Sequence, residues 1–159
     1  MFSGCSSLTQ APAIQATTLA DSCYSSMFYK CTSLLSAPAL PATTLAEYCY
    51  NTMFKGCTSL IQAPELPATT LVNSCYYYMF SGCSSLAQAP ALPATTFDYI
   101  CCAGMFSGCS NLTQAPEIKT YTPDLHAYAE MLGGSLGKLT TCIWSDLTVA
   151  EAESMVLYE

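Results

Sequence analysis

The chain has few charged side chains and no arginine, and both shortages restrict what it can bind. Charged residues make up 9% of its 159 residues, four lysines are its only Lys or Arg residues, and the formal net charge is −7. Binding a phosphate backbone requires clustered cations, and arginine is the preferred reader of base edges. The composition therefore predicts no nucleic-acid partner and no attachment to an anionic lipid surface.

Long apolar runs are also absent, although apolar residues make up 52% of the chain. No run approaches the roughly 18 residues that a membrane span requires. We therefore expect no membrane insertion by this segment, and we expect its scattered apolar side chains to be buried in a fold. No basic stretch followed by an apolar one marks a secretion signal.

The sequence repeats itself every 26 residues. The unit reads approximately MFxGC[ST]SLxxAPxLPATTLxxxCYxx, and four copies are close while a fifth drifts after Lys119. The copies are 1–26, 27–52, 53–78, 79–104 and 105–130, followed by a degenerate repeat with a C-terminal capping helix over 131–159. Self-similarity at this period is typical of solenoids, in which each unit packs only on its neighbours.

Within one unit the pattern predicts a short strand, a proline-rich turn and a short helix. Pro12 cannot donate to a strand ladder, so the strand around it is about three to five residues long. Leu19, Cys23 and Met27 follow at helical spacing, and Thr18 is a suitable N-cap. The residues expected to end these helices in a left-handed conformation are Gly4, Gly56, Gly82 and Gly108, with Lys30 in the second copy.

Nine of the eleven cysteines fall into two columns when the copies are stacked. These columns are Cys5, Cys31, Cys57, Cys83 and Cys109, and Cys23, Cys49, Cys75 and Cys101. Parallel, in-register side chains hold their Cβ atoms too far apart for good disulfide geometry, and the total is odd. A zinc site is disfavoured because there is no C-x₂-C pair and one histidine. We interpret these cysteines as small core residues, with no metal and no cofactor.

The phrase MF-x-GC-[ST]-SL resembles the BspA-like leucine-rich repeats of bacterial surface proteins, over about residues 1–130. The expected fold is a right-handed α/β solenoid with one short strand and one short helix in each 26-residue coil. The resemblance implies a cell-surface or secreted module that binds a ligand and has no enzyme activity. In one respect the chain departs from the family, because Ala and Pro stand where larger aliphatic residues are common in the strand.

Two rows of side chains are candidates for the binding surface, with a host or matrix protein or a glycan as ligand. Exposed tyrosines supply large contact area at low entropic cost, and aromatic faces suit sugar stacking. The tyrosines that flank the second cysteine column are Tyr48, Tyr50, Tyr76, Tyr77, Tyr78 and Tyr99. On the strand side, the polar row is Gln10, Gln62, Gln88 and Gln114, with Ser36 interrupting. The alternatives are tyrosines half-buried between helices and a merely solvated glutamine row.

Three other functions compete with this prediction. Ser135 in GGSLG matches the G-x-S-x-G nucleophile elbow, but the single histidine, His126, lies upstream and nothing later can serve as the base. The paired threonines could order water, as in ice-binding solenoids, although capping already explains one of each pair. A structural spacer or receptor-binding segment of a larger fibre is the third competitor.

The two ends of the array differ. A helix from about residue 149 is expected to close the last coil, with Thr148 and Glu151 as its capping box. No equivalent precedes Met1, which falls inside a repeat. We therefore expect either an upstream extension of the natural product or end-to-end self-association of two copies through the uncapped N-terminal coil.

Overall fold

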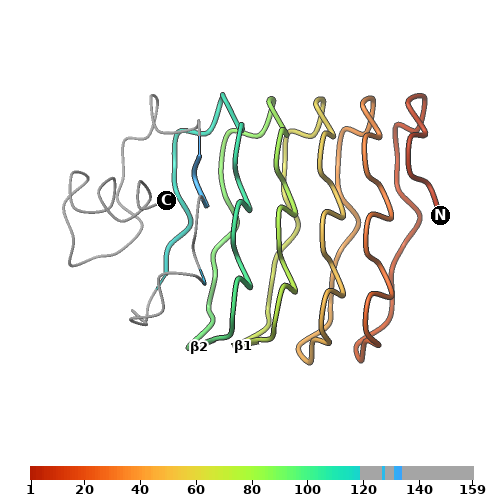
Figure 1. Cartoon of the computed structure of the whole chain (residues 1–159). Helices are drawn as coiled ribbons and strands as arrows, with labels where there is room; N and C mark the ends of the chain where they lie inside the picture. The colour runs from red at the N-terminus through yellow and green to blue at the C-terminus, as the bar shows by residue number, and fades with distance from the viewer. Residues whose placement is uncertain (119–126, 128–130, 134–159) are drawn as a thin grey trace.

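The repeats form stacked coils that lie side by side along the molecule (Figure 1). The structure is a computed structural model, and it describes residues 1–118, 127 and 131–133. Every backbone pairing between strands or bridges joins residues 26 apart, for example Thr70 with Thr96 and Ser36 with Gln62. Equivalent side chains of neighbouring repeats therefore lie next to one another.

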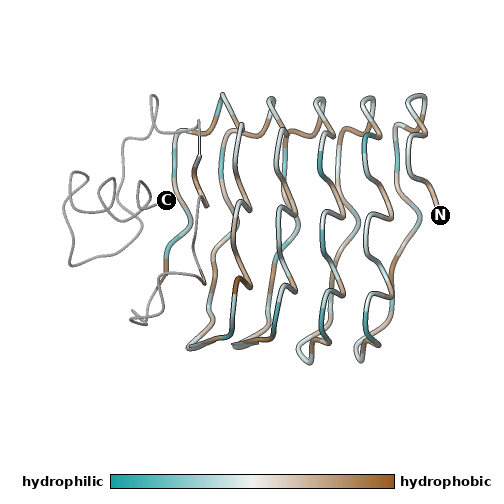
Figure 2. Cartoon of the chain, viewed as in Figure 1, coloured by the Kyte–Doolittle hydropathy of each residue, from teal (hydrophilic) through white to brown (hydrophobic). Residues whose placement is uncertain are grey.

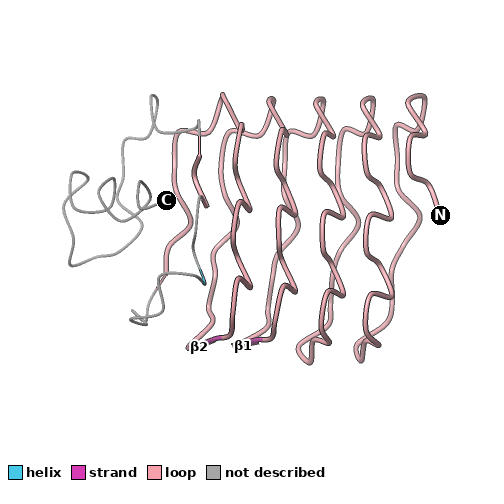
Figure 3. Ribbon diagram, in the orientation of Figure 1, coloured by secondary structure: helices cyan, strands magenta, loops and turns pink. Residues whose placement is uncertain are grey.

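The segment predicted to be a helix in each repeat is instead a continuous series of tight turns, which we call the turn side. It comprises residues 20–31, 46–57, 72–83 and 98–109, and Figure 3 shows no helix in any of them. Successive backbone N–H groups donate alternately to a carbonyl of their own coil and to a carbonyl of the next coil. Cys49 donates to the Ala46 carbonyl of its own coil at 3.3 Å, and Tyr50 donates to the Cys75 carbonyl of the next coil at 3.1 Å. The helix prediction is therefore wrong for these segments.

The spacing of the apolar residues explains the turns. Leu45, Cys49, Met53 and Cys57 are all buried and recur every four residues. Residues of an α-helix lie about 100° apart, so this spacing would rotate the apolar set by about 40° at each step. Serine, threonine, asparagine and tyrosine in these segments are also mediocre helix formers. A turn that repeats every four residues keeps the whole set facing inward.

Every fourth residue of the turn side has a positive φ. In one coil these residues are Tyr48, Thr52 and Gly56, with φ of 56°, 50° and 76°. The left-handed conformation predicted for the glycines and for Lys30 is confirmed, with φ of 56° at Lys30. Because no helix precedes them, these residues complete turns and do not act as helix caps.

The opposite side of each coil is extended but pairs sparsely. Strand β1 (Thr70–Leu71) pairs in parallel with strand β2 (Thr96–Phe97), and these two are the strands of the described chain. The strand of three to five residues predicted in the SLxxAP segment is reduced to single bridges, such as Gln88 with Gln114. Proline in these segments removes N–H donors that a longer ladder would need.

One apolar core runs through all the described coils, and hydropathy alternates along each coil in a pattern that recurs from coil to coil (Figure 2). Phenylalanine rings stack in a column with centroids 5.5 Å apart between Phe28 and Phe54 and 5.6 Å between Phe54 and Phe80. Leu34, Leu60 and Leu86 are completely buried in a second column. Stacking thus gives short segments a shared core that no single repeat contains.

The repeat continues in register beyond the fifth copy. Phe106 donates its N–H to the Met131 carbonyl at 2.8 Å, and Cys102 donates to the Ala127 carbonyl at 2.9 Å. Met131 follows Met105 by 26 residues and is completely buried. His126, Ser135 and the helix expected from residue 149 lie outside the described residues. The hand of the coil and its assignment to the leucine-rich repeats stay predictions.

Candidate binding surface

Two of the predicted binding tyrosines are core residues, so their assignment to a surface is wrong. Tyr50 and Tyr76 are each 1% exposed, and their rings stack with centroids 6.1 Å apart. The turn side buries pairs of adjacent residues, Cys49 with Tyr50 and Met53 with Phe54, and leaves Asn51 and Thr52 between them half-buried. Tyr50 and Tyr76, which each follow a cysteine of the second column, therefore lie in the core, whereas Tyr48, which precedes Cys49, is exposed.

The other predicted tyrosines lie on the turn side but do not form one continuous platform. Tyr48 is 40% exposed and Tyr99 is 51% exposed, whereas Tyr77 and Tyr78 are half-buried. The Tyr77 and Tyr78 rings meet edge to face, with centroids 4.6 Å apart. The Lys55 ammonium lies 4.5 Å from the centre of the Tyr78 ring. The Lys55 contact links Tyr78 to the neighbouring coil, and the edge-to-face contact pairs it with Tyr77 in its own coil.

The predicted glutamine row is exposed and continuous with hollows in the surface. Gln62, Gln88 and Gln114 are exposed, and parallel bridges place Gln62 beside Ser36 and Gln88 beside Gln114. We call this surface, made of residues 35–41, 61–67 and 87–93 with Gln10 and Gln114 in the same row, the glutamine–proline face. It lies on the extended side of the coils, away from the turn side.

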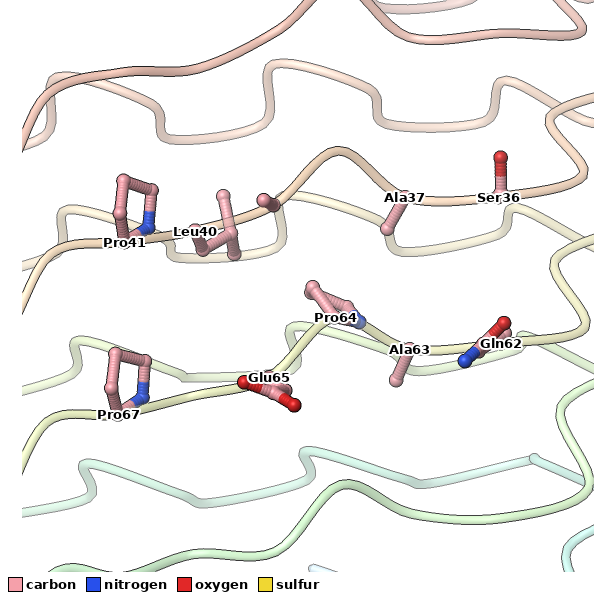
Figure 4. Close-up of a pocket in the computed structure, with 10 residues that line it drawn as sticks. Ser36, Ala37, Leu40, Pro41, Gln62, Ala63, Pro64, Glu65 and Pro67 are labelled. Carbon is pink, nitrogen blue, oxygen red and sulfur yellow. The ribbon is translucent and has the colours of Figure 1, made fainter.

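Three adjoining hollows lie on the glutamine–proline face. The first has a volume of about 440 Å³ and lies between the segments 36–41 and 62–67, which run beside each other in Figure 4. The second, of about 360 Å³, is lined by residues 61–63 and 87–90. The third, of about 320 Å³, is lined by residues 63–67 and 90–93. Ala63 lines all three hollows, so they form one irregular depression across three coils.

Proline explains why the coils leave space here. The six residues from Gln62 to Pro67 include two prolines, which have no N–H to donate to a neighbouring coil. The buried side chains Leu40, Leu66 and Leu92 hold the face on the core from below. The surface is thus fixed to a rigid frame although its own backbone pairs sparsely.

Aliphatic and acidic side chains edge this depression. Leu35 is 50% exposed and Ile61 is 62% exposed, at equivalent positions on neighbouring coils beside the glutamine row. Glu65 is exposed and lines both the first and the third hollow. Sequence reasoning missed all three residues because they occupy variable positions of the repeat, for which the consensus defines no residue. The available signal was the variation between copies, such as Thr9, Leu35 and Ile61 at one position.

The column cysteines of the interior coils are core residues with a further role. Cys57 donates its thiol hydrogen to the Phe28 carbonyl of the preceding coil at 3.1 Å, and Cys83 does the same to Phe54 at 3.2 Å. Desolvation by burial raises the pKa of Cys57 to about 12, and a hydrogen bond with the Cys31 backbone opposes this only partly. Such thiols are protonated at neutral pH and therefore poor nucleophiles.

The described cysteines are free thiols, and no group of three potential metal ligands occurs among residues 1–118, 127 and 131–133. In that same part of the chain, no helix has the length and apolar character needed to cross a bilayer. No protein-family model, no curated protein and no solved structure matches this chain. The likeness to BspA-like repeats therefore depends on the repeat phrase alone.

Proposed function

We propose that the chain is a non-enzymatic binding module of the BspA-like leucine-rich-repeat kind, belonging to a bacterial cell-surface or secreted protein. A protein or glycan ligand is held on the glutamine–proline face. The observation on which this depends is the coincidence of three adjoining hollows with an exposed glutamine row on one face. Binding residues are commonly presented on sparsely paired segments that a rigid scaffold positions.

The exposed amides suit recognition of a polymer. A glutamine side chain both donates and accepts hydrogen bonds, so Gln62 and Gln88 can pair with polar groups of either ligand class. Their positions one coil apart repeat the same groups along the face, at about 4.8 Å per coil where neighbouring segments are bridged. This repetition favours an extended ligand over a small compact one.

Two matched triple variants test the proposal on a glycan array and an array of extracellular-matrix proteins. One is Ile61→Ala/Gln62→Ala/Gln88→Ala on the glutamine–proline face, and the other is Tyr48→Ala/Tyr77→Ala/Tyr78→Ala on the turn side. We expect the natural chain to bind at least one array feature, the first variant to lose it and the folded second variant to keep it. Binding that the second variant loses and the first variant keeps would place the site on the turn side.

The two rival functions, a structural spacer and a serine hydrolase, predict different results. A chain that binds no feature on either array would favour the structural spacer of a larger fibre. Labelling of Ser135 by a fluorophosphonate probe would favour the serine hydrolase. Both results would contradict the binding proposal.

End-to-end self-association through the first coil stays a separate prediction, and the direction of the hydrogen bonds restricts it. On the turn side, each coil donates N–H groups to the next one, as Tyr24 does to Cys49, so the turn side of the first coil directs carbonyl groups away from the array. The extended side differs, because Leu35 donates back to the Thr9 carbonyl of the preceding coil. The turn sides of two first coils would therefore face each other with acceptors alone, which cannot pair. Light scattering at high concentration checks this, and we expect no symmetric dimer through the turn sides of the first coils.

A further inference from the structure

We propose that the ligand of the glutamine–proline face is an extended, cationic peptide segment with apolar side chains. This rests on the proposed function and narrows its ligand from two classes to one. Three features of the face support it: its aliphatic rim, its acidic charge and its length.

The apolar groups on the face are aliphatic. Leu35 and Ile61 are half or more exposed beside the hollows, and the residues that line the three hollows include alanine, proline and leucine but no aromatic side chain. Exposed branched aliphatic groups beside small hollows suit apolar side chains of a partner. A sugar ring would find no aromatic face there on which to stack.

Charge complementarity indicates a cationic partner. Glu65 is the charged residue in the linings, and it borders two of the three hollows. The lysines of the described chain, Lys30 and Lys55, lie on the turn side, where their ammonium groups are 5.2 Å from the Tyr29 ring and 4.5 Å from the Tyr78 ring. Glu65, with no lysine on this face among the described residues, therefore attracts a lysine or arginine of the partner.

The dimensions suit a short extended stretch. The depression crosses the two gaps between three neighbouring coils, which is about 10 Å at ~4.8 Å per gap. An extended peptide advances ~3.3 Å per residue, so about three or four residues cross it. The exposed Gln62 and Gln88 amides then lie where they can pair with the peptide backbone, while alternate side chains enter the hollows.

Fluorescence anisotropy with labelled peptide pools tests this inference. Each nonapeptide pool alternates a fixed residue with a mixture of Leu, Ile, Val and Phe, and the fixed residue is Lys in one pool and Glu in the other. A third pool alternates Lys with Ser, and a neutral β-linked hexasaccharide represents glycans. We expect the Lys–apolar pool to bind most tightly, with at least ten-fold weaker binding of the other probes.

Face variants locate the binding. We expect Ile61→Ser to weaken binding of the Lys–apolar pool about ten-fold through lost apolar burial. Glu65→Gln should weaken it about three-fold, as for an exposed ion pair. Glu47→Gln is the matched control, because it removes the same charge from an exposed residue of the turn side. It should change the affinity by less than two-fold.

The possible results distinguish failure of this inference from failure of the proposed binding function. Equal losses in Glu65→Gln and Glu47→Gln would mean general charge attraction and would overturn the inference. Hexasaccharide binding that Gln88→Ala abolishes, with no pool bound, would also overturn it but would support the binding function. Preference for the Glu–apolar pool would contradict the charge argument. Failure of every pool, the hexasaccharide and both arrays would overturn the binding function itself.

Discussion

The two sides of each coil pair their backbones with very different densities. On the turn side, all ten N–H groups from Tyr48 to Cys57 are bonded, alternately to the next coil and within their own coil. On the glutamine–proline face, Pro64 and Pro67 have no N–H, and neighbouring segments meet in single bridges such as Ser36 with Gln62. The same chain therefore alternates between a closed ladder and an open surface every 26 residues.

This difference indicates how a repeat with a narrow core combines rigidity with a binding surface. The dense ladder fixes the distance between coils, and stacked phenylalanines such as Phe28 and Phe54 fill the space behind it. Proline segments on the other side can then leave hollows without loosening the array. Sites on such scaffolds are precise because the frame, and not the loop, sets their geometry.

The largest effect that we expect is loss of the fold at high pH, which acts on the turn-side core. Burial raises the pKa of Cys49 to about 11, and of Cys57 and Cys109 to about 12, from an ordinary value of 9.0. Above pH 9 the unfolded chain loses these protons while the folded chain keeps them. The free energy of unfolding is therefore complete below pH 9 and falls as pH rises towards 12.

Denaturant unfolding at pH 7, 9.5 and 10.5 checks this prediction. Cys57→Ala should give a lower free energy of unfolding at pH 7 but a shallower fall with pH, because one buried thiol no longer titrates. An unchanged free energy of unfolding between pH 7 and 10.5 would mean that these thiols are ionised or solvated in the folded chain.

Removal of a stacked ring should have the second largest effect. Phe54 is completely buried between Phe28 and Phe80, and Phe54→Ala should lower the free energy of unfolding by about 3–5 kcal/mol. Leu35→Ala is the comparison on the open side, where Leu35 is 50% exposed, and should stay within about 0.5 kcal/mol. Chemical denaturation measures both. Similar losses would mean that the open side contributes to stability as much as the ladder.

The sequence allowed the register and the core columns to be predicted, because a strict period aligns like residues when copies are stacked. Leu34, Leu60 and Phe54 are buried for that reason. The left-handed glycines were predictable because glycine adopts a positive φ at little cost. Met131 also follows the period, although its surrounding phrase has changed.

Local structure and the exact surface could not be predicted in the same way. Spacings of three and four residues suggested a helix, but the buried pairs Cys49–Tyr50 and Met53–Phe54 require a strict period of four. This error also placed Tyr50 on the surface. The size of the hollows depends on the distance between neighbouring proline-containing segments. Ile61 and Glu65, which define the site, occupy positions where the residue varies between copies.

The cost of replacing glycine by alanine should differ between two glycines of the turn side. Gly104 and Gly82 have φ of 60° and 72°, so alanine at either position should cost about 1–2 kcal/mol for the left-handed conformation. An added Cβ at Gly82 would meet Gly56 at 3.7 Å, whereas at Gly104 it would lie 2.5 Å from the Tyr78 ring. Gly104→Ala must therefore displace that ring and its contact with Lys55.

We expect Gly104→Ala to lower the free energy of unfolding by about 0.5–1 kcal/mol more than Gly82→Ala does, since the cation–π contact is lost as well. Tyr78→Ala should remove this excess in a double-mutant cycle, because the ring is then absent. Equal costs for the two glycines, with no coupling to Tyr78, would mean that the ring moves aside freely.

The smallest expected effect is a gain in stability, from removal of the Tyr50 hydroxyl. The Tyr50 hydroxyl is buried and has no hydrogen-bond partner among the described residues, which leaves its desolvation uncompensated. Tyr50→Phe keeps the ring stacked between Tyr24 and Tyr76 and should raise the free energy of unfolding by up to about 1 kcal/mol. Tyr48→Phe, at a 40% exposed residue of the same coil, should change it by less than about 0.5 kcal/mol. A loss of stability in Tyr50→Phe would mean that the hydroxyl has a partner inside the closed ladder, and that the turn side is less dry than its dense pairing indicates.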